Sequence, residues 1–283
     1  MTRTALFLEF ARRFARNRGA LLGFLILVVV LVAALAAPWL IERDPLRIVG
    51  RPEVWPFTNP RYPLGTDSLG RDIWAMVVFG ARTTLMIGIL ASLTATVIGV
   101  VVGAFAAYFG GWVDEILTRL TELFQTIPNI LFIMTIVAIL GQTIGNITVA
   151  IGVVMWPPIA RLTRGEFLAL RDREFVQACR SMGMGDLAIM AGEILPNALP
   201  PVIVLSSLII GSSILFESAI SFLGLGDPNV ASWGALIGDG RTLIRRSWYI
   251  CAIPGLAIMF TVLAMNLIGD GLNDALNPKL RDR

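Results

Sequence analysis

The sequence predicts an all-α, polytopic membrane protein with six transmembrane helices, and three observations lead to this fold class. Hydrophobic residues make up 56% of the 283 residues and the mean hydropathy is +0.76, whereas soluble domains are roughly 45 to 50% apolar. Several apolar runs without charges reach the ~20 residues that a helix needs to cross a bilayer. A polar stretch, residues 175–197, lies between two such runs and predicts a large loop on one membrane face.

The first apolar run, residues 19–41, follows a basic segment that contains Arg3, Arg12, Arg13, Arg16 and Arg18. This order is typical of a first span with a cytoplasmic N-terminus. A cleaved signal peptide is the alternative, because Ala34-Leu35-Ala36 imitates a cleavage site and Arg12-Arg13 imitates a twin-arginine signal. The run is longer than the apolar core of a usual signal peptide, which favours a span.

Residues 42–82 are charged and contain several prolines, so we expect an extracytoplasmic loop there. Near the end of this segment Ile73, Trp74, Val77 and Val78 give one apolar helical face. They predict a helix that lies at the membrane interface before the second span.

The second span is expected within residues 83–113. It carries small residues at a strict spacing of four, namely Ala91, Ala95, Gly99, Gly103 and Ala107. Small residues let a second helix approach closely, so this stripe predicts a packing seam, with a substrate-lining face as the alternative.

A short polar loop is expected next, at Asp114, Glu115, Arg119 and Glu122. Residues 123–160 contain no charge and are long enough for the third and fourth spans, divided by a turn at residues 141–146. Pro128 should kink the third span near its start, and Trp156-Pro157-Pro158 should distort the fourth near its end. Broken helices are tolerated at membrane depth where they pack in protein or line a water-filled cavity, so both breaks point to a pathway.

The fifth span, residues 198–225, is interrupted only by Glu217. A carboxylate at membrane depth costs about 2.5 to 3.5 kcal/mol on insertion scales, so Glu217 should face the protein interior or water. It either attracts a cationic group of a substrate or pairs with an arginine or a backbone group near the outer face. Because the 224–227 loop follows within a few residues, the structural role is favoured.

A second outer loop is expected at residues 227–246 and the sixth span at residues 248–269, after which the tail returns to the cytoplasm. Arg and Lys are more numerous on the segments that this layout places in the cytoplasm. That bias supports the orientation.

The polar stretch predicts two short helices joined by a glycine turn. Phe175, Ala178, Cys179 and Met182 fall at i, i+3, i+4 and i+7, on one helical face. Gly183 can then take the left-handed conformation that ends a helix.

A second helix is expected to start at Asp186 as N-cap, with an apolar face formed by Leu187, Met190, Ala191 and Ile194. Pro196 marks the point where the following segment bends or restarts.

The residue types present exclude several chemistries. The chain has no histidine, its cysteines Cys179 and Cys251 lie far apart, and its only lysine is Lys279. Histidine catalysis, a zinc-type histidine site and the Gly-Lys pair of a phosphate-binding loop are therefore excluded, and no catalytic triad pattern or nucleic-acid groove is visible. If the protein works against a gradient, a partner must supply the energy.

The polar stretch resembles the EAA loop of bacterial ABC importer permeases, whose pattern is EAA, three residues, Gly, nine residues, IxLP. Here it reads Gln177-Ala178-Cys179, three residues, Gly183, nine residues, then Glu193-Ile194-Leu195-Pro196. Gln177, Cys179 and Glu193 depart from the pattern, whereas Gly183 and Leu195-Pro196 keep their places.

Four further stretches resemble the C-type membrane subunit of dipeptide and oligopeptide ABC importers: residues 64–85, 108–119, 217–237 and 266–280. The resemblance implies a type I importer fold, with residues 1–82 forming the N-terminal segment, first helix and outer loop. Residues 83–283 would form a five-helix core with a coupling loop at 161–197 and a cytoplasmic tail.

The resemblance also implies the assembly: a related B-type permease, two cytoplasmic ATPase subunits that bind ATP and Mg²⁺, and an extracytoplasmic binding protein that docks on the outer loops. This chain itself would hold no cofactor or metal. The residues that the resemblance assigns to ATPase coupling are Phe175, Gln177, Ala178, Cys179, Met182, Gly183, Asp186, Leu187, Leu195 and Pro196.

The expected activity is import of di- and oligopeptides across the bacterial inner membrane. Two alternatives remain open at this point. One is a permease for nickel or another small solute in the same family, although the absence of histidine leaves a bare metal ion without obvious ligands. The other is a membrane-embedded enzyme, for which the expected buried catalytic group is absent.

Overall fold

The computed structural model describes residues 14–276, and within them every regular element is a helix. The elements are α2 (Arg18–Leu40), α3 (Ile73–Phe109), α4 (Gly111–Thr126), α5 (Asn129–Leu140), α6 (Ile144–Met155), α7 (Pro157–Leu170), α8 (Glu174–Ser181), α9 (Asp186–Ile189), the π-helix η1 (Met190–Ile194), α10 (Leu195–Phe222), α11 (Trp233–Gly240), the 3-10 helix η2 (Arg241–Leu243) and α12 (Tyr249–Leu276). Arg3, Arg12, Arg13 and the tail beyond residue 276, for which the sequence predicts a cytoplasmic position, lie outside the described residues.

Four helical runs are long and apolar enough to cross a membrane: Arg18–Leu40, Ile73–Phe109, Asp186–Phe222 and Tyr249–Leu276. Two bent pairs also qualify when each pair is taken as one span, α4 with α5 at 89° and α6 with α7 at 42°. The predicted all-α fold with six spans is therefore confirmed. The bends lie at Pro128 and at Trp156-Pro157, where the missing proline amide interrupts the hydrogen-bond ladder.

The predicted polar loop at Asp114, Glu115, Arg119 and Glu122 is wrong, because these residues lie in helix α4. Its apolar residues recur every three or four positions and are exposed on one face of the helix: Trp112, Ile116, Leu120 and Leu123. Charged and apolar residues of α4 thus alternate with the period of a helix. The positions of the charges alone do not show this period. The third span consequently begins with α4 and bends sharply in its middle.

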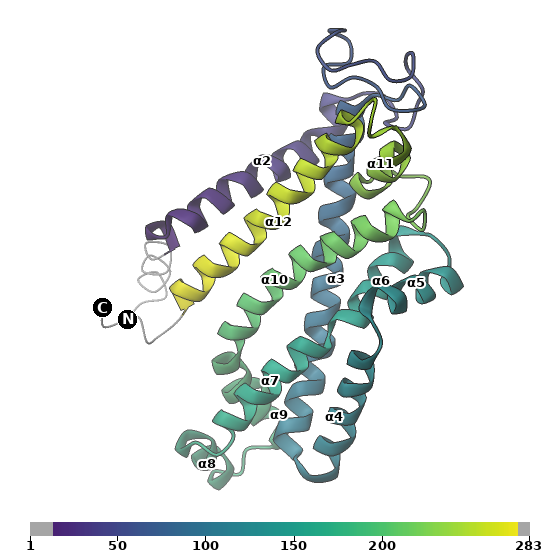
Figure 1. The fold of residues 1–283 in the computed structure, drawn as a ribbon. Helices are drawn as coiled ribbons and strands as arrows, with labels where there is room; N and C mark the ends of the chain where they lie inside the picture. The colour runs from purple at the N-terminus through teal and green to yellow at the C-terminus, as the bar shows by residue number, and fades with distance from the viewer. Residues whose placement is uncertain (1–13, 277–283) are drawn as a thin grey trace.

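Helix α3 is the longest element, with 37 residues, and it forms the axis against which other helices pack (Figure 1). The Asp72 side chain caps its first turn by accepting a hydrogen bond from the Trp74 amide at 3.0 Å. The separate interfacial helix predicted at Ile73 and Trp74 is wrong, because the chain runs without a break from there into the second span. Gly110, with φ of +64°, ends the helix.

The predicted packing seam on α3 is confirmed. Ala91, Ala95 and Ala107 are fully buried, and a Cβ atom added at Gly103 would lie 2.3 Å from the Ala160 carbonyl oxygen on α7. Close approach of the two backbones therefore requires small residues on this face of α3.

Helices α2 and α12 lie side by side along one flank of the molecule (Figure 1). Their backbones are close, because a Cβ atom at Gly23 would lie 2.8 Å from the Ala264 carbonyl oxygen. The first apolar run is thus built into the helical bundle, as expected of a transmembrane span rather than of a signal peptide.

The loop of residues 42–72 lies at the end of the molecule opposite α8 (Figure 1). Hydrogen bonds connect it to the start of α12. The Ser247 hydroxyl donates to the Glu53 carboxylate at 2.6 Å. The Tyr249 hydroxyl lies 3.0 Å from the Val54 carbonyl oxygen and 3.3 Å from that of Thr66. Residues 42–72 and the start of α12 therefore form one cap, which we call the outer cap because the sequence predicts an extracytoplasmic position for this loop.

Candidate functional site: a helical loop and a polar pocket at opposite ends

The first helix of the loop at residues 171–197 ends in a glycine turn, as the sequence predicts. Gly183 has φ of +81° and follows the C-cap residue Met182 of α8. The Gly183 amide donates to the Arg180 carbonyl at 3.0 Å and the Met184 amide to the Cys179 carbonyl at 3.1 Å. This pair of bonds is the Schellman motif, and no atom lies within 4 Å of a Cβ built on Gly183, so the backbone angle alone selects glycine.

The second helix of the loop differs from the prediction. Gly185, not Asp186, occupies the N-cap of α9, and the Asp186 side chain makes no capping bond. It accepts a hydrogen bond from the Tyr108 hydroxyl at 2.6 Å instead. Helix α9 also runs through the π-turn η1 into α10, so the predicted separate short helix is the first part of the fifth span.

The loop buries one set of apolar side chains against the end of α3 and against α7. Its own members are Val176, Cys179, Ile189, Met190 and Ile194, and the residues they meet include Ala104, Ala107, Tyr108 and Phe167. Of the predicted apolar face of α8, Cys179 is buried together with Val176, whereas Phe175, Ala178 and Met182 are exposed. Within α8, the buried cluster contains Val176 and Cys179.

Four apolar side chains of the loop project into the open. Phe175, Met182, Met184 and Leu187 have exposed fractions of 39%, 74%, 37% and 64%. They surround the Gly183 turn, and we call them the exposed apolar patch. Exposed apolar patches are typical of surfaces that bind a protein or a membrane.

The remaining predicted coupling residues lie elsewhere on the loop and at the start of α10. Gln177 is exposed and its side-chain amide donates to the Asp172 carbonyl at 3.1 Å. Leu195 and Pro196 open helix α10, and Leu195 packs against the buried cluster of the loop. Because α9 and η1 run into α10, Pro196 lies inside a continuous helical run, where its missing amide interrupts the hydrogen-bond ladder directly after the π-helix η1.

Sequence reasoning missed the residues that attach the loop to the core. Tyr108 lies within the predicted second span, residues 83–113, and its hydroxyl reaches Asp186 across 78 residues of sequence. Arg171 donates to the Ala107 carbonyl oxygen at 2.6 Å. Arg164 on α7 holds the helix that precedes the loop against α4, through a two-pronged ion pair with Asp114 at 2.6 Å. These contacts join separate elements, so no local periodicity could have indicated them.

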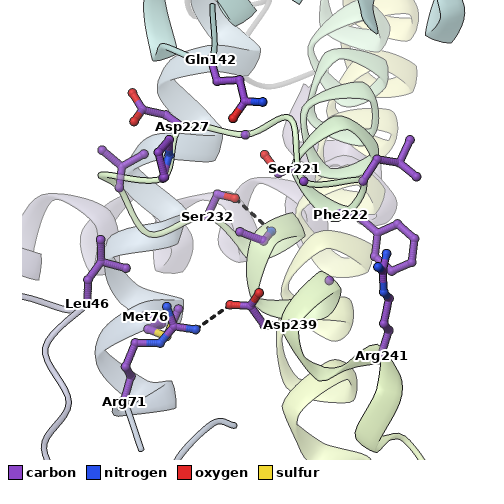
Figure 2. A pocket seen from close by; sticks show the side chains of 17 residues that line it. Leu46, Arg71, Met76, Gln142, Ser221, Phe222, Asp227, Ser232, Asp239 and Arg241 are labelled. Carbon is purple, nitrogen blue, oxygen red and sulfur yellow. Dashed lines mark hydrogen bonds and ion pairs between the residues drawn. The ribbon is translucent and has the colours of Figure 1, made fainter. Parts of the chain in front are cut away.

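At the other end of the molecule a pocket of about 320 Å³ opens among α3, α10 and α11, and Figure 2 shows its labelled side chains. Arg71 points toward Asp239 and pairs with it at 2.6 Å. Burial alone would lower the pKa of Arg71, but its bonds to Asp239 and Asp67 outweigh burial, and the pKa is raised. Arg241 lies over the Phe222 ring at 5.7 Å, so the charges near the pocket are held by partners.

Glu217 lies behind this pocket and is 1% exposed. Its carboxylate accepts hydrogen bonds from Ser221 at 2.8 Å, Thr84 at 3.3 Å and Ser218 at 3.4 Å. Ser221, which donates to this carboxylate, also lines the pocket. The partners are hydroxyls of α3 and α10 rather than the arginine or backbone group expected from the sequence.

This arrangement of spans, with a helical loop at one end and a polar cap at the other, is a fold that a solved ABC transporter shares. Its fold is similar to the structure described as inward-facing conformations of the MetNI methionine ABC transporter. The TM-score is 0.60 at 19% sequence identity, covering 71% of this chain and 96% of that chain.

The chain belongs to the family of binding-protein-dependent transport system inner membrane components, whose model matches residues 99–282. A second model, the N-terminal transmembrane domain of oligopeptide transport permease C, matches residues 6–53. The relatives include a di/tripeptide transport system permease of Pseudomonas aeruginosa, 38% identical over 97% of this chain and 92% of the relative. A glutathione transport system permease of Pectobacterium atrosepticum is 37% identical over 96% of this chain and 91% of the relative.

The protein is therefore a multi-pass permease subunit of an ABC importer in the inner membrane, and a transport subunit rather than an enzyme. This family membership implies an ATPase, a substrate-binding protein and a permease partner. The expected recognition as a C-type peptide permease is confirmed by the two family models and by the names of the relatives.

Proposed function

We propose that this permease imports di- and oligopeptides that an extracytoplasmic binding protein delivers, and that it forms half of the translocation pathway beside a B-type permease. The supporting observation is that relatives 36 to 38% identical over nearly the whole chain are named for di/tripeptides, dipeptides or glutathione. All of these cargoes are small peptides or contain peptide bonds. A nickel or other small-solute permease is the alternative.

In the proposed assembly the exposed apolar patch docks on one of two ATPase subunits, which bind ATP and Mg²⁺. Phe175, Met182 and Leu187 supply apolar surface around a turn whose shape the Schellman bonds hold. ATP-driven closure of the ATPase pair would move the loop as a rigid body and turn the spans from inward-facing to outward-facing. The coupling role of residues 161–197 follows from that docking, with Gly183 at its centre.

The proposed orientation places both termini and the loop of residues 171–197 in the cytoplasm, and the outer cap on the other side. The cap and residues 227–246 are the proposed docking surface for the binding protein. In this scheme residues 1–82 form an N-terminal unit and residues 83–283 the five-helix core.

Copurification followed by reconstitution tests the proposal. The tagged permease should bring down an ATPase and a second permease. Proteoliposomes that hold this complex and the binding protein should then take up a labelled dipeptide only with ATP. Unlabelled dipeptide and glutathione serve as competitors, and labelled Ni²⁺ is offered in a parallel assay. Uptake of Ni²⁺ without uptake of the dipeptide would favour the alternative, and recovery of the chain without any ATPase would contradict the proposal.

A further inference from the structure

Tyr108, in the last turn of α3, contacts both helices of the loop. Its hydroxyl donates to the Asp186 carboxylate on α9 at 2.6 Å. The Arg180 guanidinium, on α8, lies 5.2 Å from the centre of its ring. The side chain is only 7% exposed. One residue therefore binds the loop from both sides of the Gly183 turn, through a charge-assisted hydrogen bond and a cation–π contact.

The neighbouring residue strengthens this attachment. The Ala107 carbonyl oxygen, near the end of α3, accepts a hydrogen bond from the Arg171 guanidinium at 2.6 Å. Arg171 lies just before α8, so the loop is bound to α3 at its entrance as well as at its turn. The buried apolar cluster fills the space between these polar contacts. Two successive residues of α3 thus add polar contacts to the apolar packing that holds the loop.

Helix α3 continues without a break from this contact to the polar pocket at the other end (Figure 1). Its first turn follows Arg71, which pairs with Asp239 beside that pocket. Along the way its small-residue seam packs against α7. A displacement of the loop that Tyr108 passes to α3 would therefore reach the pocket along one rigid element.

We propose that Tyr108 is a positioning residue for coupling, which transmits movement of the loop to α3 through its hydrogen bond with Asp186. The inference rests on the proposed function, since it presumes that an ATPase moves this loop. It adds a specific mechanical connection: the loop acts on the second span through Tyr108, in addition to its continuity with the fifth span.

The test measures ATP hydrolysed per peptide imported in proteoliposomes that contain the whole complex. Tyr108→Phe keeps the ring over which Arg180 lies and removes only the hydroxyl. We expect a rise of roughly tenfold in this ratio, the factor that corresponds to one charge-assisted hydrogen bond. The amount of ATPase that copurifies should stay at the wild-type level, because the exposed apolar patch is untouched.

Companion variants separate positioning from a loss of fold. Asp186→Ala should raise the ratio as Tyr108→Phe does, and the double variant should be no worse than either single variant. Asp186→Asn keeps an oxygen that accepts from the hydroxyl and should restore most of the coupling. Thr261→Val is the matched control, because it removes a buried hydroxyl that donates to the Ala257 carbonyl at 2.7 Å within helix α12, away from both the loop and the outer cap.

The outcomes are distinguishable. A wild-type ratio in Tyr108→Phe, with normal uptake by the wild-type complex, would overturn this inference and leave the proposed function standing. Failure of the wild-type complex to import any peptide would contradict the proposed function itself. A parallel fall of assembly and uptake at a constant ratio would show a structural role only and would also overturn the inference.

Discussion

Gly183 has open space around it, so its identity depends on the backbone angle rather than on neighbouring atoms. The φ of +81° is one that residues with a Cβ adopt at a cost of roughly 1 to 2 kcal/mol. The turn directs four apolar side chains outward, and any change in its angle would change where they point. A residue without a side chain can thus control a surface that consists of side chains.

Gly183→Val should uncouple transport from ATP hydrolysis, because valine disfavours the left-handed turn. A strain of this size changes the equilibrium ratio of docked to undocked loops by roughly 5- to 30-fold. Uptake and ATP hydrolysis measured in the same vesicles check this. Gly192→Val is the control, since Gly192 is also exposed, has no positive φ and has open space around it. Equal coupling in both variants would remove Gly183 from the argument.

Glu217→Gln tests whether the buried carboxylate has a structural role or contacts the substrate. Because the carboxylate is buried and bonded to hydroxyls, we expect the half-saturating peptide concentration to stay within about twofold of wild type. Glu217→Ala should lower the free energy of unfolding of the detergent-solubilised complex by about 1 to 3 kcal/mol, because buried hydroxyls lose their acceptor. A thermal scan of the complex detects this loss as a lower melting temperature. A large rise in the half-saturating concentration with Gln, without loss of assembly, would favour contact with a cationic substrate group.

Among the elements, α3 and α7 illustrate how packing limits the sequence. The seam leaves no room for a Cβ at Gly103, where the nearest atom is a backbone oxygen that cannot turn aside. Gly165 lies on the facing helix α7, and a Cβ atom built on it would have no atom within 4 Å. Two glycines on facing helices therefore differ in whether a methyl group can be added.

Gly103→Ala should lower the melting temperature of the solubilised permease, because overpacking of this kind costs about 1 to 3 kcal/mol. Gly165→Ala, the matched control, should leave the melting temperature unchanged or raise it slightly, since alanine favours a helix. A thermal scan in one detergent compares the three proteins. Equal melting temperatures for all three would show that the seam tolerates expansion.

Sequence patterns predicted those elements whose signals are local. Apolar runs located the spans, proline located both bends, and glycine located the turn after α8. The errors share a cause. The charges of α4 indicate a loop unless its exposed apolar stripe is considered with them. The sequence favours a cap at Asp186 because the actual partner of this side chain, Tyr108, is distant in sequence. Which face of α8 is buried depends on the shape of α3 and α7, and no period within α8 contains that information.

The molecule as a whole is polar at its two ends and apolar along its length, as a membrane subunit must be. One end carries α8 and α9 and the other carries the outer cap and α11 (Figure 1). Family membership places the chain in the inner membrane, so the proposed orientation can be tested by asking which end faces the outside.

Cysteine labelling measures that orientation. In a background with Cys179→Ala and Cys251→Ala, Arg61→Cys should react with a membrane-impermeant thiol reagent added to spheroplasts. Ser181→Cys should react only after the membrane is opened. Both positions are exposed in the structure, so access to the reagent depends on the side of the membrane. The reverse pattern would invert the proposed topology.

The outer cap has a consequence for the biogenesis of the chain. The Tyr249 hydroxyl bonds to the Val54 carbonyl across 195 residues of sequence, and Ser247 reaches Glu53 across 194. At bacterial translation speeds the ribosome needs roughly ten to forty seconds to synthesise that stretch. In the proposed orientation, residues 42–72 cross the membrane during this time without the partners that hold them. A nascent chain should therefore be cleaved in this segment by a protease added outside, and should become resistant once α12 is inserted.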